Sequence, residues 1–239
     1  LISCKKESTK PYTVTKKMTK LVYVYNGGSP ETQTYSYDAQ GRFTQIVYDN
    51  NTESFVYNSA TSFTVTTRKN SDNSITSIKE CSQDATGRIT KILFKNAGGT
   101  PTSSYDYTYN AEGYMVQDLY TQISGTPYTS GSEYFLTDGN MTSIKHYDNG
   151  VHVSTSEWTY DMGKLNKEQW TYGGYWPSAT WFGKGSKNIG TTYKKRDTSN
   201  TLTWHTELTW QLDTDGYASS VNKSFPLLGT QGTQTYTYQ

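Results

Sequence analysis

The stretch YSYDAQGRFTQI, Tyr35 to Ile46, contains the unit from which much of this chain is built. Ring residues stand three and one positions before an Asp, a Gly follows three positions after it, and an alternating run comes next. The stretches DATGRITKI, from Asp84, and LDTDGYASSV, from Leu212, follow the same order. A unit that recurs at a regular period predicts an array of similar supersecondary elements.

The physics of one unit can be followed at Asp38. Side chains alternate between the two faces of a strand, so Tyr35 and Tyr37 lie on the same face. The Asp38 carboxylate accepts backbone N–H groups across a tight turn, and Gly41 takes the positive φ of a type I turn with a bulge. The alternating residues after Gly41 form the partner strand, so each unit predicts a β-hairpin.

Asp or Asn anchors with this pattern recur along the chain. They are Asn26, Asp38, Asn58, Asp84, Asn110, Asp138, Asp161 and Asp213. From Asn58 onward the steps between anchors are 26, 26, 28, 23 and 52 residues, and the last step predicts a degenerate unit near Asn188. Two strands per period predict an all-β fold, a long antiparallel meander of roughly 16 to 18 strands.

Alternation is clearest in TLTWHTELTW, residues 201–210, where Trp204 and Leu208 face one way and His205 and Glu207 the other. The chain has a half-unit at each end, KKMTKLVYVYN (16–26) and GTQTYTYQ (232–239). Pairing of these halves would close the sheet into a barrel too wide for side chains to fill, and an open spiral satisfies the same pattern.

Composition narrows the function classes. The 239 residues include 22 Tyr and 6 Trp, which supply the apolar area that few aliphatic residues provide. A net charge of +1 without long basic runs gives no electrostatic footprint for nucleic acid. No run approaches the roughly 18 apolar residues of a membrane helix.

The first residues, LISC, resemble the end of a bacterial lipoprotein signal, in which Cys4 becomes lipid-anchored. We therefore expect residues 1–16 to be a lipobox remnant and tether, followed by one repeat domain over 17–239. A lipid on Cys4 would leave Cys81 unpaired, and we expect Cys81 to be an inert buried thiol.

The YxYDxxGR unit at Tyr35 to Arg42 resembles the YD repeats of Rhs-type proteins, which form long β-sheets wrapped into shells. Only the units beginning at Asp38 and Asp84 match the full DxxGR. Together with the LISC start, the chain is also similar to Bacteroides-type lipoproteins that have a porin-like fold and no known function. The resemblance implies a lipoprotein of the outer membrane, on either its periplasmic or its surface side.

The stretch WTYGGYWPSATWFG, residues 170–183, is the densest aromatic segment. Its candidate ligand-binding residues are Trp170, Tyr172, Tyr175, Trp176 and Trp181. One interpretation is a loop whose flat rings stack on sugars or bind a partner. The other is a plug, with the rings turned inward to fill the space that a wide sheet leaves.

Catalytic signals are sparse. His146 and His152 flank the turn YDNG and can approach across a hairpin, but no further ligand accompanies them, so we expect no metal, cofactor or catalytic residue. A pore would need a lipid-facing apolar band, which charges such as Lys79, Lys91 and Glu157 interrupt.

The resulting hypothesis is a monomeric, non-enzymatic envelope lipoprotein that binds or scaffolds a glycan or protein partner. The alternatives are an outer-membrane channel component and a hydrolase acting on envelope or host glycans.

Overall fold

The computed structural model describes residues 16–168, 176 and 181–239. These residues form sixteen β-strands and no helix, so the described part of the chain contains no helix able to cross a membrane. The strands are β1 (Met18–Tyr25), β2 (Glu31–Tyr37), β3 (Phe43–Val47), β4 (Asn51–Ser59), β5 (Ser62–Lys69), β6 (Ile75–Gln83), β7 (Ile89–Asn96), β8 (Pro101–Tyr109), β9 (Met115–Gln122), β10 (Thr129–Thr137), β11 (Asn140–Asp148), β12 (Val151–Leu165), β13 (Asn188–Asp197), β14 (Leu202–Leu212), β15 (Ala218–Phe225) and β16 (Thr230–Tyr238).

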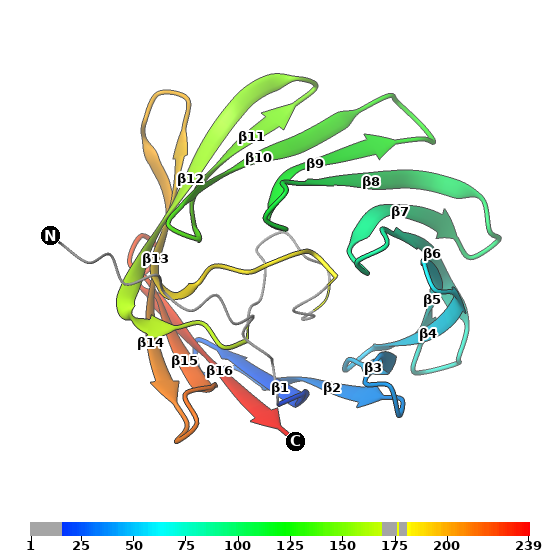
Figure 1. Ribbon diagram of the computed structural model, residues 1–239, viewed down its shortest axis with the longest axis horizontal. Coiled ribbons are helices and arrows are strands. Elements are labelled where there is room, and N and C mark those ends of the chain that lie inside the picture. Colours follow the sequence, from blue (N-terminus) through cyan, green and yellow to red (C-terminus); the bar gives the residue numbers. More distant parts are fainter. Residues whose placement is uncertain (1–15, 169–175, 177–180) are drawn as a thin grey trace, which may run out of the picture.

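The strands form a closed antiparallel barrel in which each one pairs with its neighbours in sequence (Figure 1). Closure comes from β1 and β16, where Leu21 lies opposite Tyr236 and Tyr23 opposite Gln234. The predicted all-β meander is therefore confirmed, as is the pairing of the two terminal half-units. The open spiral is excluded.

The repeated turn has the predicted geometry. At Asp38, Oδ1 accepts the backbone N–H groups of Gln40 and Arg42 at 3.0 and 2.9 Å. Gly41 takes a φ of 79°, which favours glycine because a Cβ would be strained there. The Arg42 guanidinium also pairs with Asp38 Oδ2 at 2.7 Å, which explains the Arg in the full motif.

Where a tyrosine stands immediately before an anchor, its hydroxyl can bond to the neighbouring strand. The Tyr57 hydroxyl donates to the Phe43 carbonyl at 3.1 Å, and the Tyr37 hydroxyl donates to the Met18 carbonyl at 2.7 Å. Arg42 covers the Tyr57 ring at 4.1 Å from its centroid, in a cation–π contact. The repeated tyrosine therefore packs its ring against the core and joins its strand to the preceding strand of the barrel.

The 52-residue step contains one hairpin, β13–β14, and an inserted segment of residues 166–187. The predicted degenerate unit near Asn188 was wrong, because Asn188 begins β13. The sixteen described strands lie within the predicted range of roughly 16 to 18. The anchor at Asn26 also differs from the others, since its turn lies at the opposite end of the barrel.

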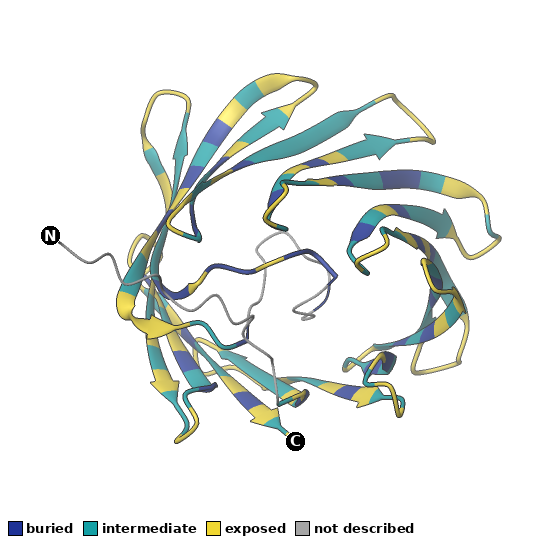
Figure 2. Cartoon of the chain, in the orientation of Figure 1, coloured by how far each residue is buried: buried dark blue, intermediate teal, exposed yellow. Residues whose placement is uncertain are grey.

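The buried residues form one hydrophobic cluster, and along many strands they alternate with more exposed residues (Figure 2). Fully buried side chains there include Ile46, Phe63, Ile92 and Val221. Cys81 is an unpaired and buried cysteine, as predicted, and burial raises the pKa of its thiol.

Candidate functional site

The DxxG turns share one end of the barrel, because each hairpin of a meander returns to its starting end. The described part of the inserted segment crosses the interior (Figure 1). Residues 181–187 of this segment, here called the plug strand, bond to the turn end of the barrel. The bonds are Ile89 N–H to Trp181 O at 2.7 Å, Lys184 N–H to Gly113 O at 2.9 Å, and Lys187 N–H to Gly139 O at 2.9 Å.

The spacing of these contacts follows from backbone dimensions. Successive contacts are three residues apart on the plug strand, and three extended residues span about 10 Å. Successive repeat turns are two strands apart, which is also about 10 Å. The plug strand therefore meets one repeat turn at each third residue, and the period of the barrel sets its register.

An aromatic cluster anchors the inserted segment inside the barrel. Trp176, Trp181 and Phe182 are 4%, 7% and 0% exposed. Trp181 stacks on Phe63 with ring centroids 4.6 Å apart and meets Phe43 edge-on at 5.4 Å. These rings fill one side of the wide interior.

A buried ion pair holds the same segment. Lys79 Nζ lies 2.5 Å from Glu53 Oε1, and Trp176 Nε1 donates to Glu53 Oε2 at 2.7 Å. The Tyr48 hydroxyl is 3.3 Å from the same oxygen. Lys79 therefore does not interrupt an outer apolar band, contrary to the sequence-based prediction, because it points inward from β6 and is buried.

The structure places only part of the predicted site. Trp176 and Trp181 lie together in the buried cluster, 5.4 Å between ring centroids. Trp170, Tyr172 and Tyr175 lie outside the described residues, as does Cys4. Ligand binding by this aromatic set and lipidation of Cys4 remain predictions.

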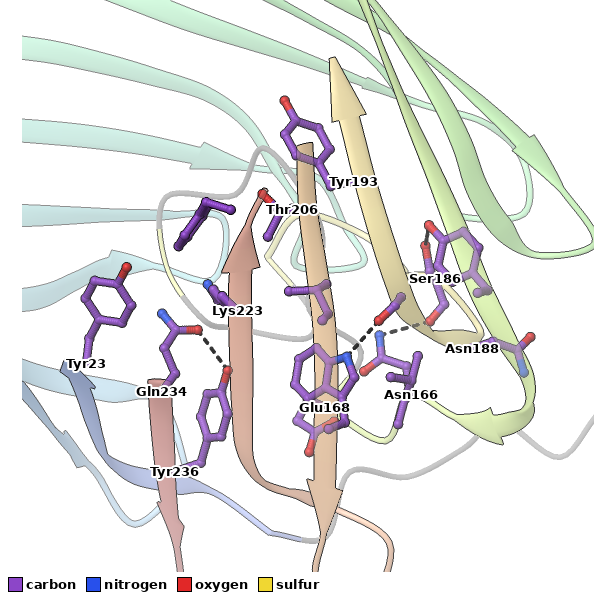
Figure 3. Close-up of a pocket in the computed structure, with 16 residues that line it drawn as sticks. Tyr23, Asn166, Glu168, Ser186, Asn188, Tyr193, Thr206, Lys223, Gln234 and Tyr236 are labelled. Atoms are coloured by element: carbon purple, nitrogen blue, oxygen red, sulfur yellow. Dashed lines mark hydrogen bonds between the residues drawn. The ribbon is translucent and has the colours of Figure 1, made fainter. Parts of the chain in front are cut away.

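A cavity of about 340 Å³ occupies the other side of the interior (Figure 3). Its walls come from β1 and β12–β16, and the inserted segment contributes Asn166, Glu168 and Ser186. Glu168 is buried, and its Oε1 accepts the Ala218 N–H and, at 3.2 Å, the Tyr238 hydroxyl. This carboxylate lies at the turn end of the barrel, where β15 begins.

Ring and apolar side chains form most of the remaining wall, with a lysine among them. The Trp210 indole donates to the Gly190 carbonyl at 2.7 Å, which fixes the ring against the cavity. Lys223 projects into the cavity from β15, and desolvation by burial lowers the pKa of its ammonium. Sequence reasoning did not single out Lys223. The sequence nevertheless indicates its position, because Val221 and Phe225 lie two residues before and after Lys223 on the same strand and are both buried. Lys223 therefore shares their inward face.

A second cavity, of about 570 Å³, lies between β8 and β13 and contains two polar pairs. The Tyr134 hydroxyl donates to Asp118 Oδ2, and burial raises the pKa of the Asp118 carboxyl. His146 Nε2 lies 2.8 Å from Ser156 Oγ. Burial lowers the pKa of His146, and the charges of Lys195 and His152 lower it further. The ring is therefore neutral near pH 7. Ser156 is buried, and its Oγ also lies 3.1 Å from the Tyr193 hydroxyl, so its hydrogen bonds are made to side chains of the barrel wall.

The two histidines considered as metal ligands, His146 and His152, each place Nε2 next to a hydroxyl group. For His152 this group is Thr155 Oγ1, at 3.0 Å. The third histidine, His205, lies 3.8 Å from the Glu207 carboxylate. Among the described residues, no three His, Cys, Asp or Glu side chains lie together in a geometry that could hold a metal ion.

Solved structures share this fold. A porin-like protein from Bacteroides uniformis ATCC 8492 aligns with a TM-score of 0.68 and 15% identity, over 93% of this chain and 98% of that one. A porin-like protein from Bacteroides vulgatus ATCC 8482 aligns with a TM-score of 0.58 and 11% identity, over 93% and 98%. No family model and no curated protein matches the sequence. The likeness establishes the barrel fold, and kinship with YD-repeat proteins remains a prediction.

Proposed function

We propose that this protein is a non-enzymatic binding protein of the bacterial cell envelope, anchored to the outer membrane by a lipid on Cys4. Its partner, a glycan or a protein, places a group inside the barrel. The observation that carries this proposal is the interior cavity, which the inserted segment lines on one side and a wall of rings lines on the other. Aromatic walls with a few polar groups are typical of ligand sites.

The cavity rings offer stacking faces. Tyr23, Tyr193, Trp210 and Tyr236 all line the cavity, and Trp210 and Tyr236 stack with an interplanar angle of 15°. Flat rings of this kind pack well against the apolar face of a sugar or against an apolar side chain. These rings support a glycan or protein partner independently of the aromatic stretch at 170–183.

The topology supports a defined orientation of the barrel relative to the membrane. The chain enters β1 at the end of the barrel where the DxxG turns lie, and the plug strand bonds to the same end. A lipid on Cys4 would therefore tether the plugged end. The opposite end of the barrel would face away from the membrane and toward a partner.

The outer face of the barrel disfavours the channel alternative. Lys91 pairs with Asp106 at 3.2 Å, and Glu157, in the middle of β12, pairs with Arg196 near the end of β13 at 3.6 Å. Charges on a lipid-facing strand cost about 2–4 kcal/mol for Arg or Lys at the bilayer midplane. A barrel with these pairs outside is better suited to water.

The polar pairs in the second cavity give little support to the hydrolase alternative. The Ser156 hydroxyl is buried, and the Asp118 carboxylate is held by the Tyr134 hydroxyl. A hydrolase needs an exposed nucleophile or a water-activating carboxylate next to its substrate. We interpret these pairs as polar bonds that stabilise the barrel.

The test uses the full chain with Cys4→Ser, which removes the lipid site. Tryptophan fluorescence is titrated with host and bacterial polysaccharides, in the parent and in Trp210→Phe. We expect a saturable shift that weakens in Trp210→Phe and persists in Trp204→Phe, since Trp204 does not line the cavity. A lack of any shift, together with no protein captured from envelope extracts, would contradict a binding role. A requirement for detergent to stay monodisperse would favour the channel.

A further inference from the structure

Three hydrogen-bond donors gather in one part of the 340 Å³ cavity. Tyr23 on β1 lies opposite Gln234 on β16, and Lys223 on β15 lies opposite Gly232, two residues from Gln234. The three side chains occupy the same side of the cavity in Figure 3. Three adjacent strands therefore bring an ammonium, an amide and a phenol together.

These donors have spare capacity. Within residues 16–168, 176 and 181–239, the Lys223 ammonium makes no hydrogen bond or ion pair, and its Nζ lies 5.8 Å from the Tyr23 ring centroid. Gln234 Oε1 accepts the Tyr236 hydroxyl at 3.0 Å, which leaves its NH₂ group for another acceptor. An ammonium without an acceptor in a partly apolar site is costly, and an incoming anion would remove that cost.

The acidic residue of the cavity stands well away from Lys223. Glu168 accepts the N–H of Ala218, which is five residues before Lys223 on β15. Five residues of strand correspond to about 16 Å. An anion beside Lys223 therefore meets the donors and avoids repulsion by the Glu168 carboxylate.

Gly232 lets the Tyr23 ring lie close to the backbone opposite Lys223. A Cβ on Gly232, directly across from Lys223, would lie 3.0 Å from the Tyr23 hydroxyl oxygen and 3.1 Å from the Val24 carbonyl oxygen. Any side chain there would crowd the space between the donors. Leu208, Trp210 and Phe225 form an apolar wall beside it, against which the rest of a ligand can pack.

We propose that Lys223, Gln234 and Tyr23 bind the carboxylate of an organic acid whose flat body packs against Trp210 and Phe225. The inference deepens the proposed function and rests on it, because it assigns the chemistry of the group that enters the barrel. The acid is a hydrophobic carboxylic acid or an acidic sugar unit of a glycan, and both present a carboxylate on a body with an apolar face. The lowered pKa of Lys223 agrees with a site that is completed by an anion.

The test is isothermal titration calorimetry on the full chain with Cys4→Ser. The probes are two matched pairs, 2-naphthoate with 2-naphthamide, and glucuronate with glucose. We expect one acid to bind at least about tenfold more tightly than its neutral partner, as a charge-assisted bond allows. Lys223→Met should remove the preference, and Lys223→Arg should keep it. The control Lys20→Met, which removes an exposed lysine from β1, should leave the preference unchanged.

The outcomes separate this inference from the proposed function. A preference for naphthoate identifies a hydrophobic acid, and a preference for glucuronate identifies an acidic sugar. Equal binding of both members of each pair, or a preference that survives Lys223→Met in a folded variant, would overturn the carboxylate site and leave the binding role intact. Binding of a polysaccharide without binding of either acid would also overturn the carboxylate site and leave the binding role intact. Failure of all four probes and of every polysaccharide, together with no protein captured from envelope extracts, would overturn both.

Discussion

The Trp176 indole nitrogen donates to Glu53 Oε2 at 2.7 Å across 123 residues of sequence. This bond ties the inserted segment to β4, and the same carboxylate pairs with Lys79 on β6. One buried carboxylate thus serves both the barrel wall and the segment inside it. The arrangement makes the interior polar at one point within an otherwise aromatic cluster.

Removal of this carboxylate should be costly. Glu53→Gln leaves the Lys79 ammonium buried without its counter-ion, and we expect the free energy of unfolding to fall by about 3 kcal/mol. Urea unfolding followed by tryptophan fluorescence measures the change. The double variant Glu53→Gln with Lys79→Met should recover part of the loss. Lys91→Met, which breaks an exposed pair with Asp106, should change the stability by less than about 1 kcal/mol.

Gly183 should tolerate no side chain. Its φ is 78°, and a Cβ would lie 2.4 Å from the Gly113 carbonyl oxygen. Gly183→Ala must therefore strain the backbone and displace the plug strand from the repeat turn. Gly87→Ala is the matched control, because Gly87 has a φ of 86° and no neighbour within 4 Å of its Cβ position. We expect a loss of about 1–3 kcal/mol for Gly87→Ala and a clearly larger loss for Gly183→Ala, by chemical unfolding. Equal losses would contradict the proposed contact.

The Tyr109 hydroxyl should stabilise both barrel and plug. It donates to the Ile89 carbonyl at 2.6 Å and lies 3.3 Å from the Trp181 carbonyl. Tyr109→Phe should cost about 1–2 kcal/mol in unfolding free energy. Tyr57→Phe loses a bond to Phe43 alone and serves as the comparison. Proteolysis between residues 166 and 187 should accelerate in Tyr109→Phe and stay unchanged in Tyr57→Phe.

The turn carboxylates should make the barrel sensitive to acid. Partial burial raises the pKa of the Asp84 carboxyl, but hydrogen bonds from Thr86 and Arg88 outweigh this effect and lower the pKa to about 2. The unfolded value is about 3.9, so the ionised carboxylate stabilises the fold above about pH 4, and this contribution disappears as the pH falls through about 2.

Asp84→Asn removes this dependence and keeps an acceptor for the turn, as Asn110 does in its own unit. Thermal unfolding as a function of pH should show a lower midpoint for Asp84→Asn near pH 6, with the difference from the parent shrinking toward pH 2. A constant difference across this range would contradict the assigned shift.

Lys223 should reduce the stability of the ligand-free protein. Its ammonium is partly desolvated and has no counter-ion among the described residues, so Lys223→Met should raise the midpoint of thermal unfolding at pH 7. Lys20→Met, at an exposed position, should leave the midpoint within experimental error. A lower midpoint for Lys223→Met would show that the lysine stabilises the barrel and would favour a structural role for it.

Much of the barrel could be predicted from local patterns. The turn at Asp38 depends on residues within four positions of each other, and the alternation in β14 depends on a period of two. Closure was one of two arrangements that the two half-units allowed, and the pairing of β1 with β16 decided between them. The inserted segment could not be predicted in this way. Its 52-residue step looked like two periods, since a count of residues does not distinguish a hairpin from a loop of similar length.

The hairpin unit, its repetition and the all-β meander follow from local sequence patterns, because they depend on contacts between near neighbours. Which side chains meet inside the barrel depends on how the strands close. Glu53 and Trp176 are 123 residues apart, and Tyr23 meets Gln234 only because the first and last strands pair. The position of Lys223 beside those residues depends on closure and on strand register. A linear pattern shows which face a residue takes, and the closed barrel determines what that face contacts.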